Sequence, residues 1–302
     1  MTKTDLIKEI NKLKQEKNAV ILAHYYCEPE VQNTADYVGD SFYLAKVAKN
    51  TDCERIVFCG VEFMGESAKI LNPEKTVLMP DKTADCPMAH MASVEKVLEM
   101  KRSCNDLAVV CYINSSAELK SVCDVCVTSS NAVNIVNKLP NKNVFFIPDG
   151  NLGRYVAKQS SKNIIFNNGY CPIHNNITVS LVKSVKNAHP SAKILMHPEC
   201  LPEVVELADY VGSTSGIIEY AQKSDAKEFI VITEIGVLHE LQKKAPDKKF
   251  YLTEPMPICA DMKKVTLKKV YNCLLNDENA VEISEDIRKK ALAPLEKMLE
   301  LG

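Results

Sequence analysis

The pentapeptide ADYVG occurs twice in the sequence, at residues 35–39 and 208–212. A more divergent copy, LAVVCYINSSAELKSVCDVCVTSS, lies between them at residues 107–130. In each copy an aromatic residue ends an apolar run, an Asp follows twelve positions later, and a hydroxyl residue stands five positions beyond the Asp. These positions are His24, Tyr112 and His197, then Asp36, Asp124 and Asp209, then Ser41, Ser129 and Thr214. The chain is therefore predicted to be one unit of about 85 residues repeated three times.

The match extends over the rest of each unit. Each opens with a helical stretch, and in the first, KTDLIKEINKLKQEK, the residues Leu6, Ile10 and Leu13 form one apolar stripe. Short apolar runs then alternate with helical segments, which is typical of βαβ units and a parallel sheet. We predict an α/β fold of three homologous three-layer αβα domains with short parallel sheets in a pseudo-threefold arrangement. The predicted domains are residues 1–86, 87–171 and 172–259, followed by a C-terminal helical tail at 260–302.

Composition and charge exclude several classes of protein. The 302 residues are 46% hydrophobic, and 37 basic and 39 acidic residues are spread along the chain. No basic stripe indicates nucleic acid binding. No apolar run approaches the roughly 18 residues that a membrane span needs, and the charged first residues do not resemble a signal peptide. We therefore expect a cytoplasmic protein that binds neither nucleic acid nor membrane.

Three of the twelve cysteines occupy equivalent positions after the fourth apolar run of each unit: Cys86, Cys171 and Cys259. Ligands of parallel α/β sheets gather at the carboxyl ends of the strands, so three thiols are expected to converge there. Three Cys ligands suit a zinc ion, for which His174 offers a fourth ligand, or an iron–sulfur cluster with one open iron. The residue types alone favour neither. The alternative is that the three cysteines are remnants of an ancestral repeat, buried at equivalent core positions. That alternative does not explain the polar residues at the other strand ends.

Those polar residues indicate what else the site can do. Tyr26, Asn114 and Glu199 each stand two positions beyond the end of the first apolar run of their unit. Glu199 is a candidate general base. Ser41, Ser129 and Thr214 are predicted to cap helices, and helix N-termini that face one cavity would bind carboxylates or phosphate.

Long stretches of the chain resemble the quinolinate synthase family. They include ILAHYY, GVEFMGESAKIL, TADCPMA, PDGNLGRYVA, NNGYCPIH, MHPEC and CADMK, and the resemblance runs from residue 21 to about residue 268. It implies an enzyme of NAD biosynthesis that condenses iminoaspartate with dihydroxyacetone phosphate to quinolinate, with loss of phosphate and two waters. It also implies a 4Fe–4S cluster held by Cys86, Cys171 and Cys259, with one iron open to substrate.

The resemblance further implies the roles of individual residues. Substrate would be bound by His24, Ser41, Tyr112, Asn114, Ser129, His174, His197, Glu199 and Thr214. The catalytic set would be Tyr26, Glu199, His24 and His197, with Tyr26 and Glu199 as candidates for the proton transfers. Iminoaspartate would come from an aspartate-oxidising enzyme. Two other classes stay open on the residues alone, a non-catalytic iron–sulfur carrier or sensor and a zinc-stabilised binding module.

Two features lie outside the family pattern or its site. The chain lacks the C-terminal Cys-x-x-Cys-x-x-Cys of some members but carries CDVC at residues 123–126. Because Cys123 is predicted at the entry to a strand and not at a helix N-terminus, a structural role is favoured over a reversible disulfide. The stretch GVEFMGES at residues 60–67 is a candidate lid or channel wall.

Overall fold

Three parallel four-stranded sheets form the framework of the computed structural model, which describes residues 1–302. The first sheet contains β1 (Ala19–His24), β2 (Tyr37–Gly39), β3 (Arg55–Cys59) and β4 (Thr76–Leu78). The second contains β5 (Leu107–Tyr112), β6 (Val125–Val127), β7 (Asn143–Ile147) and β8 (Asn163–Phe166). The third contains β9 (Lys193–Met196), β10 (Tyr210–Val211), β11 (Glu228–Ile232) and β12 (Lys249–Tyr251). The strand orders β2-β1-β3-β4, β6-β5-β7-β8 and β10-β9-β11-β12 are equivalent, which confirms the predicted repeat and the α/β fold.

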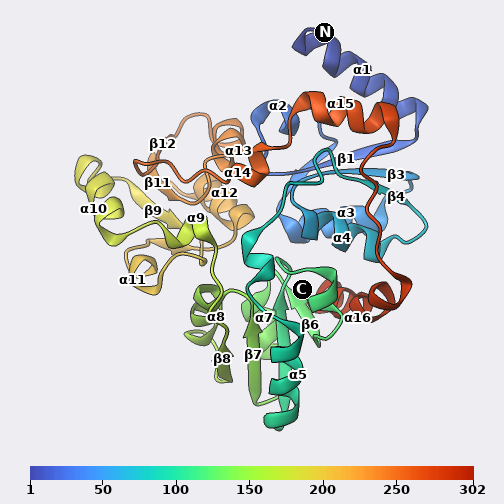
Figure 1. Cartoon of the computed structure of the whole chain (residues 1–302). Coiled ribbons are helices and arrows are strands. Elements are labelled where there is room, and N and C mark those ends of the chain that lie inside the picture. Colours follow the sequence, from blue (N-terminus) through green and yellow to red (C-terminus); the bar gives the residue numbers. More distant parts are fainter.

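Helices alternate with these strands, and the three units lie around a common centre (Figure 1). The first unit has α1 (Lys3–Glu16), α2 (Pro29–Gln32), α3 (Ser41–Asn50), α4 (Glu62–Leu71) and a 3-10 turn, η1 (Pro87–His90). The second has α5 (Val94–Ser103), α6 (Ala117–Lys120), α7 (Ala132–Lys138) and α8 (Gly150–Ala157). Then come α9 (Pro172–Asn175), α10 (Val179–Ala188), α11 (Pro202–Val205), α12 (Thr214–Lys223) and α13 (Val237–Lys244). No helix combines the length and the apolar character that crossing a membrane requires.

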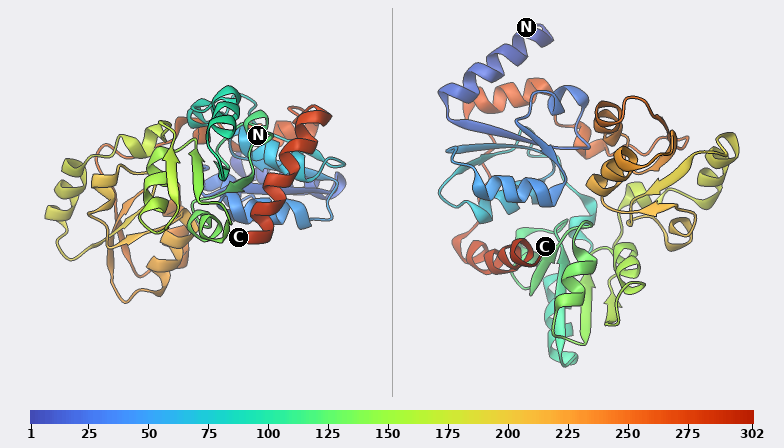
Figure 2. Two further views of the ribbon diagram at one scale, coloured as in Figure 1. Left: turned by 90° about the horizontal axis from the view of Figure 1, so that it is seen from below. Right: turned by 180° about the vertical axis from the view of Figure 1, so that it is seen from behind.

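The C-terminal segment contains the three helices α14 (Ala260–Lys263), α15 (Leu267–Asn276) and α16 (Glu285–Leu301). Helix α15 packs along α1, whereas α16 packs against α4, α6 and β6 and so joins the first two units (Figure 2). The boundaries at residues 86, 171 and 259 stay a prediction.

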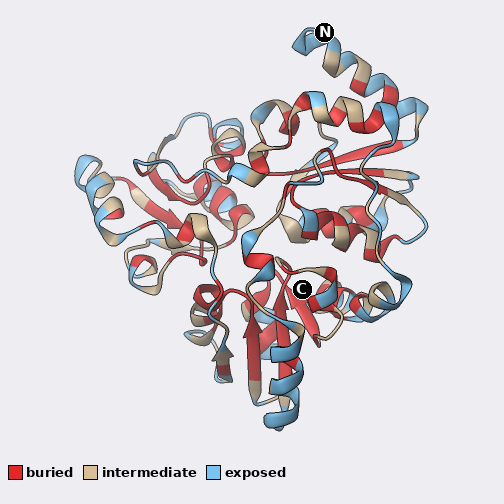
Figure 3. Ribbon diagram, in the orientation of Figure 1, coloured by how far each residue is buried: buried red, intermediate tan, exposed pale blue.

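The two inner strands of each sheet are almost completely buried, whereas most outer strands are partly exposed (Figure 3). The first two units and the C-terminal helices share one hydrophobic core of 60 buried residues. Two smaller cores of nine buried residues each lie on opposite faces of the third sheet, because alternate strand residues point to opposite sides, and one of them includes Tyr25 of the first unit. The third unit therefore packs on the first through this smaller core, and its helix α11 packs against α8 of the second unit.

The repeated Asp has the same structural role in all three units. The backbone N–H groups of Ile21, Val109 and Ile194 donate to the carboxylates of Asp36, Asp124 and Asp209 at 2.8, 2.7 and 2.7 Å. In return, the backbone N–H of each Asp donates to the carbonyl of its partner residue, which is Ile21, Val109 or Ile194, at 2.9 to 3.0 Å. This two-way contact fixes the start of the short edge strand to the first strand, which explains why Asp stands at this place in every copy.

We expect Asp124→Ala to lower the free energy of unfolding by about 1–2 kcal/mol, because Val109 loses its acceptor and Lys101 loses an ion pair of 2.8 Å. For a chain of this size the melting temperature should fall by about 2–4 °C, which differential scanning calorimetry can measure. Asp124→Asn is the matched control, since it keeps an acceptor oxygen and should lose less. An unchanged melting temperature for Asp124→Ala would contradict this structural role.

Candidate active site

A single cavity of about 290 Å³ lies where the carboxyl ends of strands from all three units meet. Its wall includes every predicted site residue except one: His24, Tyr26, Ser41, Cys86, Tyr112, Asn114, Ser129, Cys171, His197, Glu199, Thr214 and Cys259. The exception, His174, is buried directly behind the wall in contact with Cys171 and Glu199. The strand ends bring these residues together because parallel strands of equivalent sheets present their carboxyl edges to the same centre.

The three cysteines occupy the same local structure. Each is the N-cap of a single helical turn: Cys86 before η1, Cys171 before α9 and Cys259 before α14. Burial raises the pKa of all three thiols, and neighbouring carboxylates raise it further. Buried thiols of this kind stay protonated unless a bound cation displaces the proton, so the site suits a metal centre better than a free nucleophile.

The spacing of ligand atoms distinguishes between metal centres. Among the His, Cys, Asp and Glu side chains, only Cys171, His174 and Glu199 form a group of three whose ligand atoms all lie within 4.8 Å of one another. The three cysteine sulfurs therefore do not all lie that close. A single tetrahedral zinc ion would hold three thiolate sulfurs about 3.8 Å apart, whereas the iron atoms of a cube take their ligands at separate corners. Three thiols in one cavity suit a metal centre, and their spacing is wider than a single zinc ion requires.

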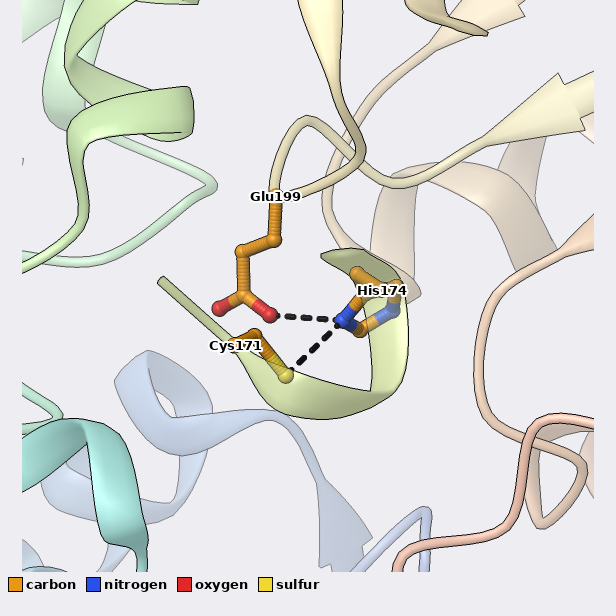
Figure 4. A group of neighbouring side chains, drawn as sticks. All are labelled: Cys171, His174 and Glu199. Carbon is orange, nitrogen blue, oxygen red and sulfur yellow. Dashed lines mark hydrogen bonds and ion pairs between the residues drawn. The ribbon is translucent and has the colours of Figure 1, made fainter. Parts of the chain in front are cut away.

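Glu199 is the centre of a buried polar network (Figure 4). Its Oε2 lies 2.7 Å from His174 Nδ1, and its Oε1 accepts a hydrogen bond of 2.6 Å from the Tyr112 hydroxyl. Burial by itself raises the pKa of Glu199, but nearby His197 and His174 and the two accepted hydrogen bonds lower it below its usual range. The carboxylate is therefore ionised and held in a fixed orientation next to the cysteines.

Two further histidines are present as neutral hydrogen-bond donors. Burial lowers the pKa of His24 and of His197 to about 3 in each case, so both rings are uncharged at neutral pH. The backbone N–H groups of Tyr26 and Glu199 donate to the Nδ1 atoms of His24 and His197, at 3.1 and 3.4 Å. The proton of each ring therefore sits on Nε2, and in His197 this nitrogen lies 3.2 Å from the Ser129 hydroxyl. Such donors fit the carbonyl or carboxylate oxygens of a small acidic molecule.

The prediction that Ser41, Ser129 and Thr214 cap helices is wrong. Asp40 caps α3 by accepting the N–H of Tyr43 at 3.0 Å, and Ser213 caps α12 in the same way. Helix α7 begins only at Ala132, after Ser129. A cap is the residue immediately before the first turn, so a shift of one position changes its role. Ser41 and Thr214 are first helical residues that line the cavity, and the Thr214 hydroxyl lies 2.9 Å from the Tyr26 hydroxyl.

The sequence reasoning missed three polar residues beside the cavity. Thr233 and Glu234 follow β11 and are fully buried, and Lys263 in α14 pairs with Glu234 at 3.0 Å. Thr233 and Glu234 could have been found from the sequence, because this polar pair directly follows the apolar run FIVI at residues 229–232. The other predicted site residues also follow apolar runs, at the carboxyl ends of strands.

The structure also shows where the CDVC segment at residues 123–126 and the stretch at residues 60–67 lie. Cys123 and Cys126 are buried free thiols, with Cys126 opposite Cys111 in the pairing of β5 with β6. Cys123 precedes β6 and does not start a helix, as predicted, and its structural role stays a prediction. The stretch at residues 60–67 forms a wall of the cavity through Val61, Phe63 and Met64.

The fold and the cavity define a class of protein: an α/β enzyme that binds a small polar molecule at the junction of three repeated units. Within this class the chain belongs to the quinolinate synthetase A family, whose family model, described as "Quinolinate synthetase A protein", matches residues 8–300.

Individual relatives are similar along almost their whole length. The quinolinate synthase of Fusobacterium nucleatum subsp. nucleatum is 57% identical over 294 residues, which cover 97% of this chain and 98% of the relative. The quinolinate synthase of Clostridioides difficile is 52% identical over 299 residues, or 99% and 98% of the two chains. That of Caldicellulosiruptor bescii is 52% identical over 295 residues, or 97% of each.

Proposed function

We propose that this enzyme is a quinolinate synthase of NAD biosynthesis that condenses iminoaspartate with dihydroxyacetone phosphate. Phosphate and two waters are lost, and an aspartate-oxidising enzyme supplies the iminoaspartate. Family membership and full-length identity to proteins named quinolinate synthase support this activity. The single observation that carries the proposal is the arrival of one cysteine from each repeat in the same cavity, among neutral histidines and a buried carboxylate.

Cys86, Cys171 and Cys259 would hold a 4Fe–4S cluster, leaving one iron without a protein ligand. When bound, the cluster supplies a Lewis acid that polarises an oxygen of the substrate. The donor set supports this assignment, because three thiols at N-caps of single turns are spaced too widely for one zinc ion.

The other residues of the cavity would bind and orient two acidic substrates. Ser41 and Thr214 begin the ten-residue helices α3 and α12, whose N-termini attract carboxylate or phosphate groups. The Nε2–H groups of His24 and His197 would donate to substrate oxygens, with Tyr112, Asn114 and Ser129 completing the polar wall. His174 would act from behind the wall by fixing Glu199.

Glu199 and Tyr26 would transfer protons during the dehydrations. Glu199 is ionised and can take a proton, while burial raises the pKa of Tyr26 well above its ordinary value, so its phenol keeps its proton until a stronger base removes it. This is the pairing of a base with an acid that the loss of two waters requires.

A zinc site at Cys171, His174 and Glu199 is the second candidate, because their ligand atoms lie within 4.8 Å of one another. Purification without oxygen distinguishes the two. A brown protein with about four irons per chain that forms quinolinate from both substrates, with iminoaspartate generated in the assay by aspartate oxidation, supports the proposal. A colourless zinc protein supports the binding module, and a brown protein that makes no quinolinate supports the electron carrier.

A further inference from the structure

We propose that Thr233 and Glu234 are positioning residues of the active site, which dock the third unit on the first and fix Tyr26 and Cys259. Both directly follow β11, at the edge of the third sheet that faces the centre, and both are fully buried. This inference deepens the proposed function and rests on it for the kinetic part of its test. It adds Glu234, which lines the cavity, and Thr233, which contacts the site residues from behind its wall.

Thr233 links a side chain of the first unit to one of the segment that carries Cys171. Its Oγ1 lies 2.8 Å from the Tyr26 hydroxyl and 2.9 Å from His174 Nε2. His174 in turn lies 2.7 Å from Glu199, which accepts the Tyr112 hydroxyl at 2.6 Å. One hydroxyl therefore connects Tyr26 with the Glu199 network, although the two proton-transfer candidates are 173 positions apart in the sequence.

The chemistry of the contacts fixes what Thr233 must supply. Tyr26 has a second partner, the Thr214 hydroxyl at 2.9 Å, so its phenol is held between two threonines. A hydroxyl can donate one hydrogen bond and accept others, whereas a methyl group of the same size can do neither. Without the Thr233 hydroxyl, the buried His174 Nε2 has no partner and Tyr26 keeps only one. Misplacing a proton-transfer group by a fraction of its hydrogen-bond length lowers the rate more than the affinity.

Glu234 holds the loop that ends at Cys259. Its Oε1 accepts the backbone N–H of Cys259 at 3.0 Å, and its Oε2 accepts that of Gly236 at 2.6 Å. Lys263, one turn beyond Cys259, pairs with the same carboxylate at 3.0 Å and donates to the carbonyl of Tyr26 at 2.6 Å. The Glu234–Lys263 pair thus ties together a strand end of the third unit, the last cysteine and the backbone of Tyr26.

A third contact strengthens the same junction. The Gln32 amide, buried in the first unit, donates to the carbonyl of Gly236 at 3.2 Å and to those of Tyr25 and Cys27 at 2.8 Å each. The third unit does not share the large hydrophobic core of the other two, so these hydrogen bonds act together with the packing of Tyr25 in a smaller core to align it with the first unit.

The first test compares Thr233→Val, which removes the hydroxyl at constant shape, with Thr233→Ser, which keeps it. We expect kcat for quinolinate formation to fall about thirtyfold in Thr233→Val with KM within about threefold, because two hydrogen bonds are lost behind the reacting groups. Thr233→Ser should recover most of that rate, and iron content should equal that of the wild type in both. Wild-type kcat in Thr233→Val, or equal losses in both variants, would overturn the positioning role of Thr233.

The second test does not depend on activity. Glu234→Gln cannot accept both backbone N–H groups and leaves Lys263 unpaired, so iron release to a chelator should be about tenfold faster. Lys263→Gln changes the partly exposed member of the same ion pair and should also release iron about tenfold faster. This variant tests the proposal if Glu234→Gln does not fold. Glu240→Gln is the matched control, since it breaks another buried Glu–Lys contact of the third unit away from the cavity. Unchanged iron release from the folded Glu234 and Lys263 variants would overturn the role of Glu234.

The two tests separate this inference from the proposed function. If the wild-type protein binds iron and makes no quinolinate, the proposed function fails, and iron release still decides the role of Glu234. If the wild type makes quinolinate and neither Thr233→Val nor Glu234→Gln differs from it, the positioning inference alone fails.

Discussion

We expect Glu199→Gln to retain the proposed iron–sulfur cluster and to form quinolinate about a thousandfold more slowly, the scale of a lost general base. Glu199 is buried, ionised and hydrogen-bonded to both Tyr112 and His174. A glutamine keeps the volume of the side chain and has one acceptor oxygen in place of two, so its NH2 group faces one of those two donors. It is also too weakly basic to take a proton from substrate. Both effects act on the chemical step.

The measurement is kcat alongside iron content and visible absorption on the same preparation. Glu203→Gln is the control, because Glu203 lies four positions further on, at the exposed surface of α11. Normal quinolinate output from Glu199→Gln would remove Glu199 from the catalytic set. If the Glu199→Gln protein contains no iron, Glu199 instead belongs to the metal site.

Cys171→Ser will bind less than half the iron of the wild type and form no measurable quinolinate. Serine is a far weaker ligand for iron than a thiolate, and each of the three cysteines would supply a different corner of the cluster. The same loss is expected for Cys86→Ser and Cys259→Ser, because each cysteine has the same N-cap position in its own unit. Iron analysis and visible absorption of protein purified without oxygen measure the result.

Cys104→Ser is the matched control for these variants. Cys104 is a free thiol whose residue has the same intermediate exposure as the three proposed ligands, and it does not line the cavity. It should keep wild-type iron and activity. A Cys171→Ser protein with full iron content, or a Cys104→Ser protein that loses its iron as well, would contradict the ligand assignment.

Much of the site follows from the repeat because position in a parallel sheet decides which residues meet. His24, Tyr112 and His197 end the first strand of each unit or directly follow it, and the thiols follow the fourth. Strands of equivalent order place equivalent residues at equivalent edges. The sequence pattern therefore predicts which residues line the cavity, even though it contains no distance.

The helix caps were predicted wrongly for a reason of the same kind. Hydrophobic periodicity places a helix start within a residue or two, whereas capping depends on which backbone N–H points at which side chain. Asp40 and Ser213 stand one position before the predicted residues Ser41 and Thr214. Because of that single step, Ser41 and Thr214 line the cavity and do not cap a helix.

By itself, the sequence determined the three repeats, the parallel sheets and the strand-end positions of the cysteines and histidines, because these depend on the period of apolar residues and on local spacing. Only the tertiary structure decided which polar groups touch. The contacts of Thr233 with Tyr26 and His174, and those of Glu234 with Cys259 and Lys263, join segments from different units. A hydrogen bond forms within a few tenths of an ångström, and a spacing counted along the chain does not fix the distance between two folded units to that precision.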